Sequence, residues 1–114
     1  MGRLVREQIK FSEDVGKLLL FISELPNYAV TLGEAYRTKE QQKLYIKNGK
    51  SKTMNSMHLK RLAIDLNLFV DGNLTWEIEE YRVLGKYWES LDDKNVWGGS
   101  WKNFKDVPHF QRTF

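Results

Sequence analysis

The sequence predicts a small α+β domain, a mixed fold with a central antiparallel sheet flanked by helices. The chain has 114 residues, a length typical of one domain, here spanning residues 1–114. Some segments repeat apolar residues at three- and four-residue steps, as amphipathic helices do, and others alternate apolar and polar residues, as strands do. The two kinds of segment are intermixed without the regular alternation of a parallel sheet, which favours the α+β class.

Three segments are predicted to be helical, each opening at a residue whose hydroxyl serves as the N-cap. The predicted caps and helix ends are Ser12 and Leu25, Thr38 and Lys47, and Thr75 and Leu91. In the third segment Trp76 and Trp88 lie on or beside the apolar stripe, so both are expected in the core.

Three segments are predicted to be strands: residues 28–36, 62–70 and 109–111. In the second of them five aliphatic residues alternate onto one face, which leaves Asp65 on the opposite face. An Asp-Gly pair, typical of a tight turn, follows this strand. A carboxylate in the middle of a strand is unfavourable by propensity, so Asp65 is expected to have a partner.

Composition restricts the possible chemistry of the chain. It has no cysteine, which excludes disulfides, thiolate metal sites and thiol nucleophiles, and it has two histidines. Any metal site must therefore use histidine and carboxylate ligands. The longest apolar run, Leu18 to Ile22, is far shorter than the roughly 18 residues of a membrane span.

The charge of the chain is mildly basic, with a net charge of +3. A charge of this size suits nucleic acid, an anionic membrane surface, an anionic wall polymer or an ordinary soluble surface. The lysines are dispersed among acidic residues along the sequence, which disfavours a nucleic-acid-binding face. Residues 1–10 contain three basic residues with no apolar core after them, so we expect no secretory signal and synthesis in the cytoplasm.

Both histidines have polar neighbours that suggest a metal site. His58 precedes Asp65 by seven residues, and His109 follows Asp106 by three. A His, Asp, His set suits zinc and leaves a fourth position for water, the pattern of a catalytic site in which the metal activates water for amide hydrolysis. Each residue also has an ordinary interpretation, as a structural histidine or as a turn or capping aspartate.

The sequence motifs resemble a known family. The string S-M-H-L-K-R-L-A-I-D at residues 56–65 resembles the S-x-H-x-x-G-x-A-x-D signature of the zinc-dependent D-alanyl-D-alanine carboxypeptidase and L-alanyl-D-glutamate endopeptidase family, which is VanY-like and has a phage endolysin branch. The string D-V-P-H-F at residues 106–110 is similar to its second element, and Y-R-T-x-E-Q-Q at residues 36–42 to its upstream arginine segment. The resemblance spans about residues 32–110.

This resemblance implies a Hedgehog/DD-peptidase-like fold and one Zn²⁺ per chain. The implied metal ligands are His58, Asp65 and His109. Asp106 would be the general base, and Arg37 would bind or polarise the substrate carbonyl and stabilise the oxyanion. The implied substrate-binding residues are Ser56, Arg37, Trp97 and Trp101, with ordinary packing as the alternative for the two tryptophans. Lys50 and Lys52 are expected to be solvated loop charges.

One departure from the motif concerns the backbone, and one detail concerns the substrate. Arg61 stands where the family has glycine, so the turn between His58 and Asp65 is not expected to use a positive φ there. The Asp-x-Pro-His ending resembles the endopeptidase branch and favours that activity.

The function implied is that of a zinc metallopeptidase acting on bacterial peptidoglycan stem peptides, with the L-alanyl-D-glutamate bond preferred. The chain would be the catalytic domain of a phage-type endolysin, a monomer that reaches the cell wall or periplasm through a holin-type pore, with no nucleic acid partner and no stable membrane insertion. The alternatives are a D-alanyl-D-alanine carboxypeptidase or dipeptidase and a non-catalytic zinc-site binding module of the same fold.

Overall fold

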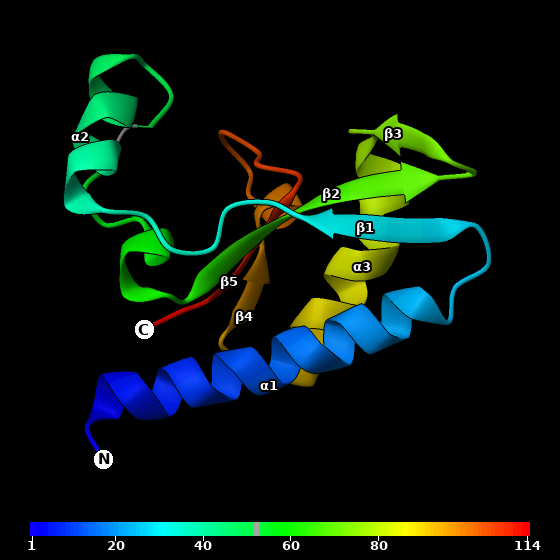
Figure 1. The fold of residues 1–114 in the computed structure, drawn as a ribbon, viewed down its shortest axis with the longest axis horizontal. Helices are drawn as coiled ribbons and strands as arrows, with labels where there is room; N and C mark the ends of the chain where they lie inside the picture. The colour runs from blue at the N-terminus through cyan, green and yellow to red at the C-terminus, as the bar shows by residue number, and fades with distance from the viewer. Residues whose placement is uncertain (52) are drawn as a thin grey trace.

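The computed structural model describes residues 1–51 and 53–114 (Figure 1). Its strands form an antiparallel sheet in the order β1-β2-β5-β4, and β3 pairs with β2 beside this order. Lys52 lies outside the described residues. The elements are α1 (Arg3–Ser23), β1 (Tyr28–Leu32), α2 (Lys39–Lys47), the 3₁₀ helix η1 (Met57–Lys60), β2 (Ala63–Val70), β3 (Asn73–Thr75), α3 (Ile78–Leu91), β4 (Asn95–Trp97), the 3₁₀ helix η2 (Gly98–Ser100) and β5 (His109–Arg112). The predicted α+β class is confirmed. Among the described residues, no helix has the length and apolar character needed to cross a bilayer.

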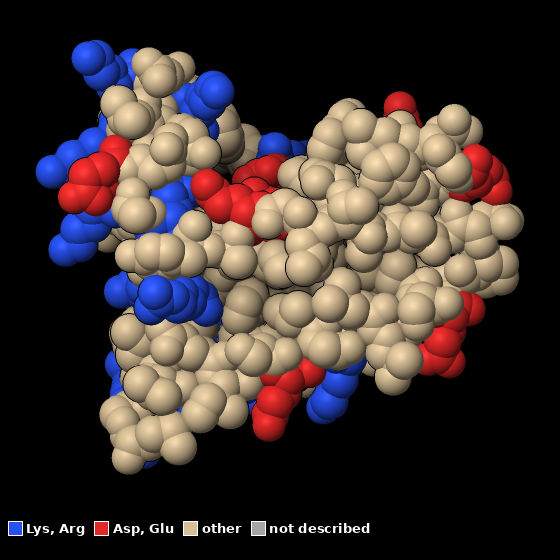
Figure 2. All heavy atoms as spheres, viewed as in Figure 1, with Lys and Arg blue, Asp and Glu red and all other residues tan. Residues whose placement is uncertain are grey.

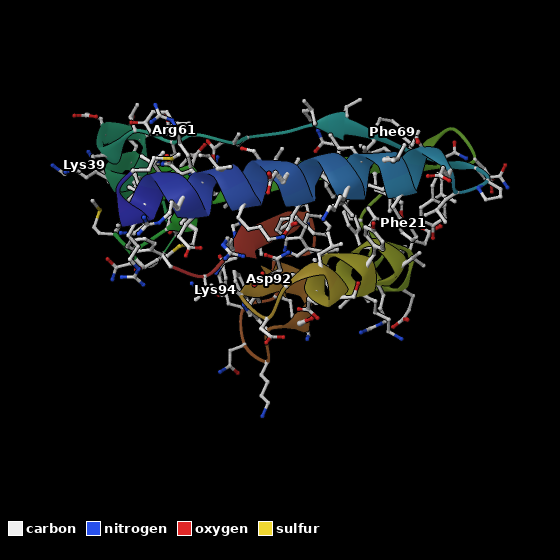
Figure 3. All side chains as sticks on the ribbon, turned by 90° about the horizontal axis from the view of Figure 1, so that it is seen from below. Phe21, Lys39, Arg61, Phe69, Asp92 and Lys94 are labelled. Atoms are coloured by element: carbon white, nitrogen blue, oxygen red, sulfur yellow. The ribbon has the colours of Figure 1, made fainter. Side chains whose placement is uncertain are left out.

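Buried aliphatic side chains alternate with less buried ones along β2, and this alternation decides which face of the sheet carries the core. The aliphatic side chains of β2 are buried against α1 and α3, two helices that pack on each other and cover this face of the sheet (Figure 3). The opposite face carries Asp65 and is free of these helices. The largest buried side chains of the core are Trp88, Trp97, Tyr81, Phe110, Leu18 and Ile22.

Helix α1 begins well before the predicted cap. Ser12 lies in its middle, and its hydroxyl donates to the carbonyl of Gln8 one turn earlier, so the prediction of an N-cap there was wrong. Tertiary contacts hold the first half of the helix: Glu7 is paired with Arg112 of β5, and the Gln8 side chain donates to the Lys60 carbonyl at 2.8 Å. These partners are distant in sequence, which is why local signals placed the helix start too late.

The segment after β2 folds as a hairpin whose turn was predicted and whose second strand was not. Asp71 and Gly72 both have positive φ, which gives the predicted tight turn, and the chain then pairs with β2 as β3. Thr75 therefore ends a strand, and α3 starts three residues later at Ile78. Trp76 is 53% exposed and is not a core residue, whereas Trp88 is buried as expected.

The hydroxyl of Tyr81 completes the hydrogen bonding of β2 at the junction between the part paired with β5 and the part paired with β3. It donates to the Leu66 carbonyl at 2.7 Å and accepts from the Leu68 N–H at 3.1 Å, and burial raises the pKa of this tyrosine to about 12. We expect Tyr81→Phe to lower the free energy of unfolding by about 2–3 kcal/mol, because two buried backbone groups lose their partner. Urea unfolding measures this loss.

Tyr87→Phe is the matched control, since Tyr87 stacks on Phe21 through its ring and its hydroxyl has no hydrogen-bond partner among the described residues. Equal stability of the two variants would contradict the bridging role of Tyr81.

Helix α2 is held differently from the other two helices. The predicted cap is confirmed, since the Thr38 hydroxyl accepts from the Gln41 N–H. Gln42 is the buried residue of this helix, so a polar side chain attaches it to the rest of the fold. In Figure 1, α2 stands apart at one end of the molecule, away from α1 and α3.

Candidate functional site

Strand pairing brings Asp65 and His109 together. The two residues lie directly opposite each other on β2 and β5, so their side chains share the sheet face that α1 and α3 leave uncovered. His109 Nδ1 is 3.3 Å from Asp65 Oδ1. The two residues are 44 positions apart in the sequence, so no local pattern indicates this register.

The second histidine reaches the same carboxylate from η1. Ser56 caps this short helix by accepting from the His58 N–H, and the imidazole of His58 is 2% exposed. His58 Nδ1 donates to the Ala35 carbonyl at 2.9 Å, so its Nε2 points toward Asp65 Oδ1, 3.3 Å away.

The turn between η1 and β2 corrects the expectation for Arg61. This residue adopts the left-handed conformation, φ 57° and ψ 38°, that glycine favours at a helix C-terminus. Arginine therefore adopts at this turn a backbone conformation that glycine would favour. The Arg61 guanidinium lies over the Tyr36 ring, 4.2 Å from its centroid.

The three side chains form a group able to hold a metal ion. One donor atom from each of His58, Asp65 and His109 lies within 4.8 Å of the other two. Burial alone raises the pKa of Asp65, but hydrogen bonds from the two histidines outweigh it and lower that pKa to about 2. Burial alone lowers the pKa of His109, but Asp65 and Gln111 raise it above its ordinary value. The group thus offers a carboxylate that stays ionised.

Asp106 stands beside this group and is held by a glycine contact. Its Oδ2 is 3.9 Å from His109 Nδ1, and its side chain is 43% exposed. Partial burial raises the pKa of its carboxyl above the ordinary aspartate value. The Asp106 N–H donates to the Gly98 carbonyl, and a Cβ on Gly98 would lie 2.1 Å from the Asp106 carbonyl oxygen. Only glycine at position 98 permits this approach.

Arg37 is held on the other side of the site by several side chains, of which the sequence analysis had assigned a role only to Ser56. Its Nε donates to Glu34 at 2.7 Å, and Nη2 also bonds Glu34. Nη1 donates to Gln42 at 2.7 Å and to Ser56 at 3.3 Å, and the guanidinium lies 4.6 Å from the ring centroid of Tyr45. Gln42 could have been suspected from its place in the arginine segment, whereas Glu34 carries no motif signal.

Several of these residues line a cleft of about 550 Å³. The described residues that line this cleft include Arg37, Ser56, His58, Asp106, His109 and Trp101. Lys50 also lines the cleft, which differs from the expectation of a purely solvated charge. Trp97 is not among the lining residues, because it is 1% exposed and packs in the core with its indole N–H on the Val107 carbonyl. The expectation that Trp97 walls the cleft was therefore wrong.

A family model matches the part of the chain that carries most of these residues. The model described as D-alanyl-D-alanine carboxypeptidase, of the M15 peptidases, matches residues 49–112, which include His58, Asp65, His109 and Asp106. The chain belongs to this family.

Curated relatives of this M15 chain share its sequence over most of its length. The L-alanyl-D-glutamate peptidase of Listeria phage A118 is 34% identical over 105 residues, which cover 84% of this chain and 34% of the relative. The peptidoglycan L-alanyl-D-glutamate endopeptidase CwlK of Bacillus subtilis (strain 168) is 36% identical over 100 residues, 72% of this chain and 59% of the relative. The chain thus spans about a third of the length of the phage A118 peptidase and about three-fifths of the length of CwlK.

A solved M15-like structure has the same fold. The L-Ala D-Glu endopeptidase ChiX of Serratia marcescens superposes with a TM-score of 0.76 at 27% sequence identity, over 91% of this chain and 78% of that chain.

Gln111 is a further residue of this M15 site that the motif analysis missed. Its amide oxygen is 2.7 Å from His109 Nε2, so the Nε2–H donates to it while Nδ1 faces Asp65. Residues two apart on a strand share a face, and this spacing from His109 is the signal that indicates Gln111.

Proposed function

We propose that this chain is a zinc-dependent peptidase that hydrolyses peptidoglycan stem peptides at the L-alanyl-D-glutamate bond. The observation that carries the proposal is that His58, Asp65 and His109 form one group able to hold a metal ion, and that Asp106 lies beside this group in the cleft that both histidines line. The bond is suggested by the two relatives, which are named for it. We also propose that the chain acts as a monomeric catalytic domain.

The donor chemistry of the site fits zinc. Two imidazoles and one carboxylate are the ligand types of catalytic zinc sites, and three protein ligands leave a position for water or substrate. When bound by His58, Asp65 and His109, zinc supplies a Lewis acid that acidifies water and polarises the scissile carbonyl.

The chain's own residues then handle the proton and the substrate. The Asp106 carboxylate accepts the proton of the water that adds to the scissile carbonyl and passes it to the amine that leaves when the C–N bond breaks. Arg37 has five N–H groups, four of which point to Glu34, Gln42 and Ser56. The fifth has no hydrogen-bond partner among the described residues, and we propose that it donates to the substrate oxygen. Ser56 supports it by accepting from Nη1.

The proposal is tested by digesting purified sacculi with and without a zinc chelator and identifying the new amino termini by mass spectrometry. We expect free D-glutamyl amino termini that the chelator abolishes. Release of D-alanine instead would identify a carboxypeptidase, and intact sacculi with zinc still bound would identify a binding module. Asp106 and Arg37 in the cleft favour an enzyme, because a purely structural metal site needs neither of them.

A lytic role in phage infection is part of the same proposal. It is supported by the Listeria phage relative, and it places the action at the bacterial cell wall. Release through a holin-type pore belongs to this proposal and is tested by expressing the chain inside bacteria with and without a holin. Lysis that depends on the holin is expected.

Gln111 is expected to strengthen metal binding through His109. Replacing it with leucine removes the acceptor that orients the imidazole, and outer partners of this kind typically contribute 10- to 100-fold in metal affinity. We expect Gln111→Leu to weaken zinc binding by about that factor in a chelator competition assay. Gln111→Glu keeps an acceptor and should retain the affinity. Equal zinc affinity of the leucine variant and the parent would contradict this role.

A further inference from the structure

Charge is distributed very unevenly along the chain. Residues 36–62 contain eight Lys or Arg residues and one acid, Glu40, a net charge of +7 in a chain whose total is +3. Residues 63–93 contain eight acidic residues and two basic ones. The lysines that look dispersed in the whole sequence are therefore concentrated in the segment that carries α2 and η1.

The fold places this charge on one end of the molecule. Lys39, Lys43 and Lys47 follow at four-residue steps along α2, so they form one stripe, and all three are exposed. Basic side chains gather over α2 in Figure 2, and Figure 3 shows Lys39 and Arg61 at the same end. We call Lys39, Lys43, Lys47, Lys50 and Arg61 the basic face.

The basic face is unfavourable for the isolated domain. Like charges four residues apart destabilise a helix, and α2 buries little that would compensate. Among the described residues, no carboxylate pairs with the ammonium groups of Lys39, Lys43, Lys47 or Lys50, whereas Arg37 beside them is paired with Glu34. An anionic partner would relieve this repulsion.

The basic face is continuous with the cleft. Lys50 belongs to both, and the buried Gln42 joins α2 to the cleft, since its amide bonds Arg37 on one side and the Ser51 hydroxyl and Thr53 carbonyl on the other. A polymer that lies along α2 therefore reaches the site where one of its bonds is cut.

We propose that the basic face binds the carboxylate-bearing stem peptides of peptidoglycan neighbouring the one in the cleft, and so holds the chain on its insoluble substrate. The choice of polymer rests on the proposed function. Stem peptides repeat along each glycan strand and carry free carboxylates, which match several lysines spaced along a helix. Binding of this kind is dominated by long-range attraction and weakens as salt screens it.

The test compares two double variants of equal charge. Lys43→Gln/Lys47→Gln neutralises the centre of the basic face outside the cleft, and Lys17→Gln/Lys86→Gln removes two exposed lysines from α1 and α3. At low salt we expect the first double variant to bind sacculi stripped of phosphate polymers about 10- to 30-fold more weakly than the parent chain does. The control double variant should weaken this binding by less than about threefold. The difference should vanish at high salt. Hydrolysis of a soluble stem tripeptide should be unchanged in both.

Further arms identify the partner. Sacculi whose carboxylates have been converted to amides should lose salt-sensitive binding. Equal loss by both pairs, unchanged binding to amidated sacculi, or stronger binding to phosphatidylglycerol vesicles or duplex DNA than to stripped sacculi would overturn the proposal. If the parent binds sacculi in this salt-sensitive way but cuts no stem peptide, the proposed function fails while the basic face stands.

Discussion

Asp106→Asn is expected to lower kcat/KM for stem-peptide hydrolysis by about 10²- to 10⁴-fold while leaving the fold and the metal content unchanged. The carboxamide has nearly the shape of the carboxylate but cannot accept a proton. The Asp106 backbone contacts, to the Gly98 carbonyl and from the His109 N–H, are independent of the side chain. The loss should therefore fall mainly on kcat.

The measurement is a steady-state assay on a soluble stem peptide, together with metal analysis and a thermal unfolding curve. Asp71→Asn is the matched control, because Asp71 lies exposed in the β2–β3 turn and asparagine tolerates its positive φ. Near-parental activity of Asp106→Asn would contradict the assignment of Asp106 as the general base. A parallel loss of metal would mean that Asp106 supports the metal site instead.

Asp65→Asn is expected to abolish metal binding and, with it, activity. Asp65 is the anion of the cluster, and both histidines point at its Oδ1. A neutral carboxamide is a poor ligand for a divalent cation, and the two imidazoles alone form an incomplete site. We expect metal content to fall from about one ion per chain to near zero, and kcat/KM to fall by more than about 10³-fold.

Metal content of the purified variant is measured by mass spectrometry after dialysis against a weak chelator. Asn67→Ala is the control, since Asn67 lies two residues further on the same face of β2 and its amide bonds Thr31 rather than the cluster. It should keep both metal and activity. Full metal occupancy in Asp65→Asn would show that the site lies elsewhere.

Much of the site could be predicted because most of its residues belong to short sequence motifs. His58 and Asp65 are seven residues apart, on either side of one turn, and Asp106 precedes His109 by three residues. The alternation of β2 also indicated correctly that Asp65 faces away from the aliphatic core. Local spacing carries such information, because the backbone between nearby residues has few conformations.

Other predictions failed where distant partners decide the outcome. α1 extends nine residues before Ser12 because β5 and η1 supply partners for Glu7 and Gln8. Trp97 is buried because α3 has a glycine, Gly85, at the point where the indole packs. Strands β3 and β4 are three residues long, too short to produce a periodic signal, and exist through pairing with β2 and β5.

By itself, the sequence determined the α+β class, the residue types able to hold a metal ion and the family to which the motifs belong, since these depend on residue identity and short spacing. The tertiary structure alone decided that His109 lies opposite Asp65, that Gln42 and Gln111 hold Arg37 and His109 in place, and that the lysines of α2 gather beside the cleft. Strand register and helix placement depend on burying apolar surface over the whole chain, a condition that no local pattern expresses.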